Sequence, residues 1–98
     1  MKQTKNYGVK HLNQGEYYID RKDPAKTIIY YNAFPEDLQQ IQNLSNNYMM
    51  RSEPTEYGNF GERKIIPLIK KCIVLSMAYK EILDHLDQKQ YKQVYRET

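Results

Sequence analysis

The chain has 98 residues, enough for one domain with a modest core, and carries 15 Lys and Arg against 12 Asp and Glu, a net charge of +3. This mild basic balance permits a nucleic-acid partner and argues against an acidic protein that imitates DNA. The single cysteine, Cys72, excludes an internal disulfide and a cysteine-based zinc site. No apolar run is long enough to span a membrane, and residues 1–15 lack the apolar segment of a signal peptide, so we expect a cytoplasmic protein with no membrane contact.

The first fifteen residues, MKQTKNYGVKHLNQG, hold three lysines and one histidine but no carboxylate. We expect residues 1–15 to form a basic N-terminal arm and residues 16–98 to form a single α+β domain. Polar side chains of this kind can hydrogen-bond phosphates and base edges, and a short arm that ends in a turn can enter a DNA groove. A solvated tail is the other interpretation. The arm's candidate DNA contacts are Lys2, Thr4, Lys5, Asn6, Lys10 and His11.

Two β-branched and aromatic runs follow the arm, residues 16–20 (EYYID) and 26–31 (KTIIYY). They flank Asp23-Pro24, a turn signal, so we expect a β-hairpin. Next, Pro35 suits a first helical position, and apolar residues recur every three or four positions from there. This spacing predicts an amphipathic helix, whose buried face is formed by Leu38, Ile41, Leu44 or Ser45, and Tyr48.

The second half of the sequence predicts a loop and two further helices. Residues 51–62 (RSEPTEYGNFGE) contain one proline and two glycines, which is typical of a loop. From Arg63 a broad apolar stripe predicts a long core helix, although Pro67 is unfavourable inside a helix and moves the expected regular start to about residue 66. Asp87 can cap a short C-terminal helix. The basic residues expected near the start of the long helix are either phosphate contacts or a solvated face; they are Arg63, Lys64, Lys70 and Lys71.

The sequence offers little that points to catalysis. His11 and His85 are far apart, and Asp84-His85-x-Asp87 has no second ligand pair, so a solvated helix end is favoured over a metal site. Cys72 lies in the apolar stripe and predicts a buried, inert thiol. The stretch YGNFGERK has two glycines but lacks the spacing of a phosphate-binding loop. We therefore expect no enzyme activity, no cofactor and no metal.

The opening stretch MKQTKNYGVKHLNQGEYY resembles the N-terminus of the late-transcription activator of phi-29-like phages. The identities that carry the resemblance are Met1, Thr4, Leu12, Glu16 and Tyr17, and it extends loosely to Leu38, Ile41 and Tyr48. The resemblance covers the first half of the chain and implies a DNA-binding dimer that acts on host RNA polymerase. It implies that a hook with a threonine and an arginine enters the major groove. Thr4 matches the threonine, but Asn6 stands at the arginine position, so the contact with guanine is lost.

The leading hypothesis is therefore a small phage-type DNA-binding transcription regulator, a homodimer that grips duplex DNA with its arms in the host cytoplasm. The alternative is a phage-encoded inhibitor of a host or anti-phage defence protein. Its surface would be the tyrosine-rich hairpin and the acidic stretch from Glu53 to Glu62. A third hypothesis is a structural component of the virion.

Overall fold

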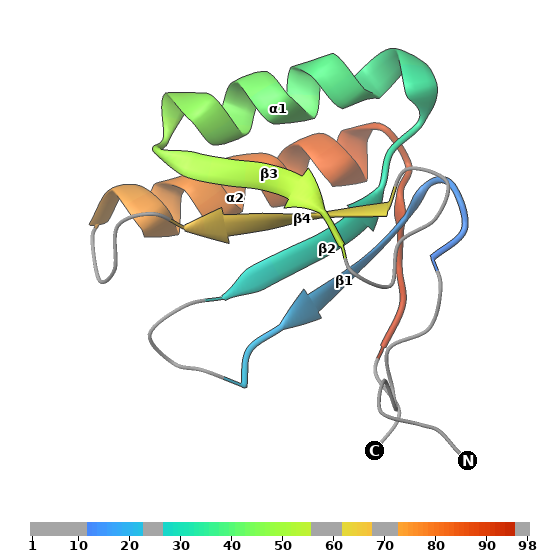
Figure 1. Ribbon diagram of the computed structural model, residues 1–98, viewed down its shortest axis with the longest axis horizontal. Helices are drawn as coiled ribbons and strands as arrows, with labels where there is room; N and C mark the ends of the chain where they lie inside the picture. The colour runs from blue at the N-terminus through green and yellow to red at the C-terminus, as the bar shows by residue number, and fades with distance from the viewer. Residues whose placement is uncertain (1–11, 23–26, 56–61, 68–72, 96–98) are drawn as a thin grey trace.

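The computed structural model describes residues 12–22, 27–55, 62–67 and 73–95, with only the backbone described for 73–76. Within these ranges the protein is α+β: a mixed five-stranded sheet in the order β3-β4-β2-β1-β5 packs on one face against two helices (Figure 1). The elements in chain order are β1 (Glu16–Asp20), β2 (Ile28–Asn32), α1 (Leu38–Asn47), β3 (Met50–Pro54), β4 (Glu62–Pro67), α2 (Ile73–Gln88) and β5 (Lys92–Gln93), with a short 3₁₀ turn (Pro35–Asp37) before α1.

The first two strands, β1 and β2, pair antiparallel, and most of the turn expected between them lies outside the described residues. Because side chains alternate along a strand, each strand has one face toward the helices and one away from them. Ile29 and Tyr31 of β2 are fully buried under the helices. Tyr18 and Tyr30, directly opposite each other on the other face, stack with their ring centroids 5.4 Å apart. The tyrosines therefore serve both faces of the sheet.

The helix predicted after Pro35 is confirmed as the 3₁₀ turn followed by α1. Ile41 and Ser45 form its buried face, and Ser45 Oγ satisfies its hydrogen-bonding need by donating to the carbonyl of Ile41 at 3.0 Å. Leu44 is only half-buried, so of the two residues left open by the sequence, Ser45 points into the core. After α1, Met49 takes a positive φ of 56° and turns the chain into β3.

The loop expected over residues 51–62 and the long helix expected from Arg63 are both wrong in part. Residues 50–54 form edge strand β3 and residues 62–67 form β4, and α2 is described from Ile73 to Gln88. The apolar residues of β4 alternate toward the helices, with Ile65 fully buried and Pro67 buried at the strand's end. Pro67 is tolerated there because it lies past the last residue of β4 that pairs with β2.

The short C-terminal helix is also wrong. Asp87 belongs to the last turn of α2, and a positive φ of 65° at Gln90 turns the chain away from the helix. Tyr91 is then buried, and the chain continues as β5, parallel to β1. Backbone bonds from Lys92 N to Gly15 O at 2.9 Å and from Val94 N to Tyr17 O at 2.8 Å hold it there.

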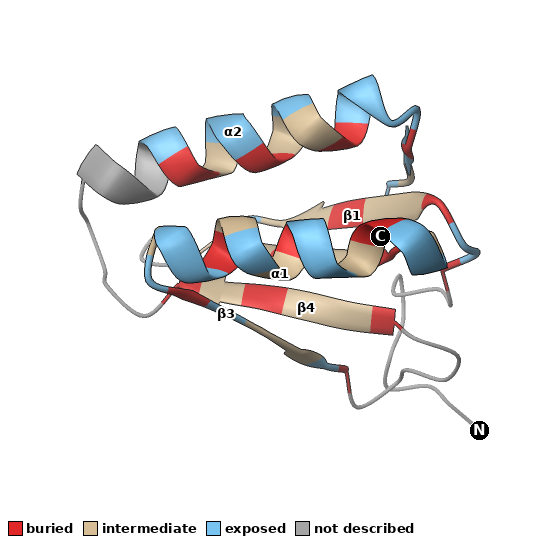
Figure 2. Ribbon diagram, turned by 90° about the horizontal axis from the view of Figure 1, so that it is seen from above, coloured by how far each residue is buried: buried red, intermediate tan, exposed pale blue. Residues whose placement is uncertain are grey.

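The core lies between the sheet and the two helices, and Figure 2 shows buried residues on the inner sides of both helices. Its members from α2 are Ala78, Ile82 and Leu86, each fully buried. Among the described residues, neither helix is both long and apolar enough to cross a bilayer.

On the sheet face turned away from the helices, the chain entering β1 is held in place. The Leu12 N–H donates to Glu62 Oε2 at 2.8 Å, and the Leu12 carbonyl accepts from Asn32 Nδ2 at 3.0 Å. All three residues are buried. Leu12 is thus fixed to β2 and β4.

Two features of β3 reduce the number of free backbone groups along its open edge. The Thr55 N–H donates to the Glu62 carbonyl at 3.2 Å. In an antiparallel pair, successive residues direct their backbone N–H and C=O groups alternately toward the partner strand and away from it. The backbone groups of Ser52 and Pro54 therefore point to the open edge. Pro54 has no N–H to offer, and the Ser52 carbonyl already accepts from Arg63 Nη2 at 3.2 Å. Both features are ways in which proteins block the pairing of a second sheet.

Candidate functional site

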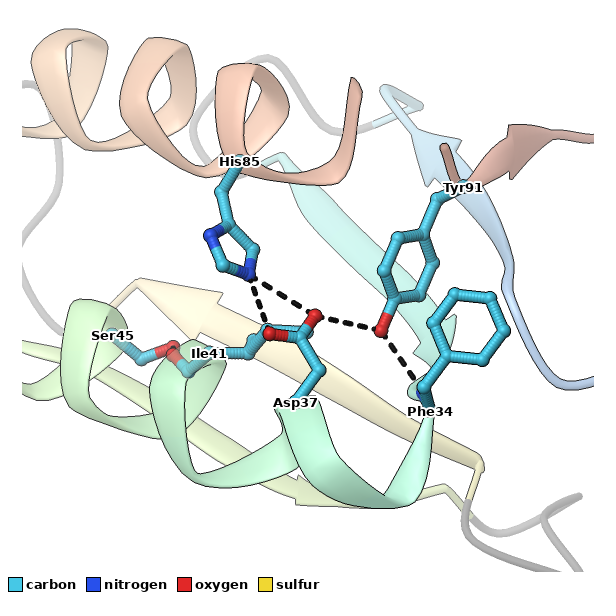
Figure 3. A network of polar contacts seen from close by, with 6 residues as sticks. All are labelled: Phe34, Asp37, Ile41, Ser45, His85 and Tyr91. Carbon is cyan, nitrogen blue, oxygen red and sulfur yellow. Dashed lines mark hydrogen bonds and ion pairs between the residues drawn. The ribbon is translucent and has the colours of Figure 1, made fainter. Parts of the chain in front are cut away.

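The most connected polar cluster in the described residues lies where the start of α1 meets the end of α2. It comprises Asp37, His85 and Tyr91, with the backbone of Phe34 (Figure 3). Asp37 occupies the N-cap position of α1, but its side chain makes no capping hydrogen bond. The carboxylate instead points across to α2 and to the residue before β5, so it connects three elements.

Asp37 is buried and accepts hydrogen bonds from two side chains. His85 Nε2 lies 2.8 Å from Asp37 Oδ1 and 3.1 Å from Oδ2, and the Tyr91 hydroxyl donates to Oδ2 at 2.8 Å. An ionised carboxylate only accepts, so Nε2 of His85 carries a hydrogen. The other ring nitrogen, Nδ1, points away from the carboxylate in Figure 3. Asp37 thereby fixes the orientation of the imidazole.

The hydroxyl of Tyr91 both donates and accepts a hydrogen bond. It donates to Asp37 and accepts from the Phe34 N–H at 2.9 Å, while the two rings pack with centroids 4.8 Å apart. Burial raises the pKa of Tyr91 above its usual value, and the adjacent Asp37 carboxylate acts in the same direction. The hydroxyl therefore stays protonated and remains a donor to Asp37.

Gly15 completes the packing around Phe34. Its φ is +86°, and a Cβ at this position would lie 2.5 Å from the end of the Phe34 ring. Both the backbone conformation and the space require glycine here. Because Lys92 N donates to the Gly15 carbonyl, the same residue also fixes the start of β5.

A shallow groove of about 300 Å³ lies beside His85 between the two helices. It is lined by Gln40, Asn43, Leu44, Asn47 and His85. The paired Asp37 and His85 have the arrangement of an acid–base dyad, but catalysis also requires a nucleophile, a metal or a convergent set of polar groups. The described residues contain no group of three or more His, Cys, Asp or Glu able to hold a metal ion. What the geometry establishes is a clamp that joins α1, α2 and β5.

The sequence predicted none of these partnerships. The sequence pattern favours a solvated helix end for His85 and singles out no partner for Asp37. The two residues are 48 positions apart, and only the fold brings them together. The position of His85 in α2 did indicate partial burial. His85 precedes the fully buried Leu86 and follows Ile82 by three positions, so it lies at the margin of the apolar stripe.

Most of the predicted DNA contacts lie outside the described residues. These are Lys2, Thr4, Lys5, Asn6, Lys10, His11, Lys70 and Lys71. Arg63 and Lys64 are described, but they belong to β4 and not to a helix, so their side chains point to opposite faces of the sheet. The structure therefore does not bring these two residues together as one basic surface.

Arg63 is engaged within the protein. Its Nε donates to Ser52 Oγ at 3.2 Å, and Nη2 donates to the Ser52 carbonyl at the same distance. Lys64 lies on the helix-free face, directly opposite Glu53 of β3. Arg63 is therefore held by Ser52, while the contact of Lys64 with phosphate stays a prediction.

The surface expected for the inhibitor hypothesis is partly buried. Tyr18 and Tyr31 of the tyrosine-rich strands are buried, while Tyr17 and Tyr30 are half-buried. In the acidic stretch, Glu62 is buried, and residues 56–61 lie outside the described ranges.

Comparison with known proteins adds no family to this description. No protein-family model matches the chain, and neither a curated protein nor a solved structure gives a significant match. The resemblance to the phi-29-like activator therefore stays a prediction.

Proposed function

We propose that the protein is a small DNA-binding transcription regulator whose affinity for duplex DNA comes from residues outside the described body, chiefly the basic arm. The supporting observation is the distribution of charge. The described residues carry eight Lys and Arg against nine Asp and Glu, whereas the whole chain carries 15 against 12. The described residues thus carry one more negative than positive charge, and the positive excess of the chain belongs to the remaining residues.

The environment of Arg63 supports the same division of roles. Arg63 is held by Ser52 through two hydrogen bonds, so phosphate contacts fall chiefly to the other predicted residues. Leu12 is anchored through its backbone to Asn32 and Glu62, which gives the arm a rigid point of attachment. A basic segment attached to a nearly neutral body can follow a groove without bringing carboxylates close to the phosphates.

The test is a salt series of binding to a fluorescent duplex of random sequence. Deletion of residues 2–10 removes three lysines but keeps Met1 and the His11–Leu12 peptide bond. We expect the deletion to make the slope of log K against log salt less steep by roughly 2.7. The dissociation constant should rise to about 10⁻⁴–10⁻⁶ M. A matched control replaces three exposed lysines of the body by glutamine (Lys80, Lys89 and Lys92), with the same loss of charge.

The control variant, which lacks the three lysines of the body, should retain most of the slope of log K against log salt. Equal slopes for the deletion and the full chain would refute the proposal, as would the absence of any duplex binding by the full chain at low salt. In the latter case the inhibitor of a host or defence protein becomes the better proposal. Thr4→Ala and Asn6→Ala should relax preference at particular base pairs, while Lys2→Ala and Lys5→Ala should weaken binding to all sequences.

Contact with host RNA polymerase is part of the proposal only through the resemblance to the phage activator. Its test is a gel shift with purified bacterial polymerase on a promoter fragment bound by the protein. A slower-migrating ternary complex would support the contact. Unchanged migration at a polymerase concentration that binds the promoter alone would limit the proposal to DNA binding.

A further inference from the structure

The outer face of α1 has an unusual composition for an exposed helix. Charged residues make up 28% of the chain, yet α1 contains none. Figure 2 shows exposed residues recurring along this helix. All five of them are carboxamides: Gln39, Gln40, Asn43, Asn46 and Asn47. Depletion of charge on an exposed face is a feature of protein contact surfaces.

Two exposed methionines border the same end of this helix. Met49 follows α1 and is 57% exposed, and Met77 of α2 is 55% exposed. Tyr48 donates a hydrogen bond to Glu81, and Met77 lies one turn before Glu81 on α2. The two methionines are thus close to one contact between the helices. Methionine is common at binding surfaces because its side chain adapts to the partner.

Met49 also occupies a position that normally favours glycine. Its φ of 56° is in the left-handed region, which is unfavourable for a residue that carries a Cβ. The Met49 side chain makes little packing contact within its own chain, since more than half of the residue is exposed. A contact with a partner molecule would explain why a large apolar side chain stands here.

We infer that the α1 surface, defined as the five carboxamides with Met49 and Met77, binds a second copy of this chain about a two-fold axis. In such a dimer each surface meets an identical one. Lysine or glutamate near the axis would meet its own charge, whereas a carboxamide carries both a donor and an acceptor and can pair with its own copy. A surface built only from carboxamides and methionine is therefore self-complementary.

The arrangement also has a geometric rationale. With the two α1 helices antiparallel, Asn43 lies near the middle of the helix and so near the axis. Met49 then meets the Gln39–Gln40 end of the other helix, where the groove beside His85 begins. The β3 edge, by contrast, is partly blocked by Pro54, which has no N–H, and by the Arg63 side chain on the Ser52 carbonyl. The helix surface is the better self-association site.

The test is the molar mass of the full chain in solution without DNA, measured by sedimentation velocity from about 1 to 100 μM. Since no DNA is present, its outcome is separate from that of the proposed function. We expect the dimer mass at the upper concentrations. Asn43→Lys and Asn43→Asp should each weaken dimerisation at least tenfold, and mixing the two variants should restore it, because opposite charges then face each other.

Gln14→Lys and Gln14→Asp are matched controls, since Gln14 is an exposed carboxamide outside the α1 surface. Met49→Gly should raise the melting temperature of the monomer while weakening the dimer, which a purely structural role of Met49 would not produce. Circular dichroism of each variant verifies folding. A monomer mass for the wild type at every concentration would overturn the inference, and so would unchanged dimerisation in both Asn43 variants.

Discussion

The hydroxyl of Tyr91 lies 2.8 Å from the carboxylate of Asp37, 54 positions earlier in the chain. Through this bond the residue just before β5 fixes the N-cap residue of α1. His85 completes the arrangement from the last turn of α2. The cluster is therefore a long-range connection in which a buried charge receives two donors, and removing either donor has a measurable cost.

Tyr91→Phe should lower the free energy of unfolding by about 1–3 kcal/mol. The substitution keeps the ring that packs on Phe34 but removes the donor to Asp37 and the acceptor for the Phe34 N–H. Urea unfolding at pH 7 measures the change. Tyr95→Phe, at a 73% exposed tyrosine, is the control and should be neutral. Equal stability of both variants would show that the clamp contributes nothing.

Gly15→Ala should destabilise the fold by about 2–4 kcal/mol. The added Cβ would stand 2.5 Å from the Phe34 ring, and the φ of +86° disfavours any side chain. Because Gly15 also binds β5 through its carbonyl, we expect faster amide exchange at Lys92 before global unfolding. Hydrogen exchange that leaves Lys92 protected as in the wild type would contradict the local effect.

Stability should fall as the pH rises above about 10. Burial raises the pKa of Tyr79 to about 12 and also raises that of Tyr91, whereas an unfolded tyrosine titrates near 10. Above pH 10 the folded state thus keeps the tyrosine protons that the unfolded state has released. The resulting stabilisation is fully present below pH 10 and is lost as the pH rises through the pKa values of the folded state. Urea midpoints between pH 8 and 11.5 measure the loss. Tyr79→Phe should flatten the decline and Tyr95→Phe should not.

Ile82→Ala should cost about 2–5 kcal/mol, because Ile82 is fully buried where α2 packs against the sheet. Met77→Ala on the exposed side of the same helix should change monomer stability by less than about 0.5 kcal/mol. Thermal melts of the two variants at low protein concentration provide the comparison. Similar melting temperatures would mean that the inner face of α2 is assigned incorrectly.

The parts of the fold that the sequence predicted are those with a strong local pattern. Residues 16–20 and 28–32 are rich in Ile and Tyr and form strands, and the apolar spacing after Pro35 produced α1. The strand β4 was missed because its apolar residues Ile65, Ile66 and Pro67 run on toward the stripe of α2 and were merged with it. Pro67, recognised as unfavourable in a helix, was the correct warning.

The remaining elements depend on contacts that no local pattern encodes. Strand β3 is polar because it lies at an edge, so Arg51, Ser52 and Glu53 resemble a loop. Strand β5 has two residues and exists because Gln90 turns the chain back onto β1. The cluster of Asp37 and His85 was missed for the same reason, since each residue alone is ordinary and only their pairing is informative.

The position of Tyr91 and β5 in the sequence has a consequence for biogenesis. These residues are synthesised after every other described element, yet they complete a core that begins at Leu12. Until they leave the ribosome, Asp37 lacks its tyrosine donor and β1 has an unpaired edge, so the nascent chain is open to proteases and to mispairing. Nonsense products that stop after Gln88 should consequently be cleared rapidly in cells, even though both helices and four of the five strands described here have already been made.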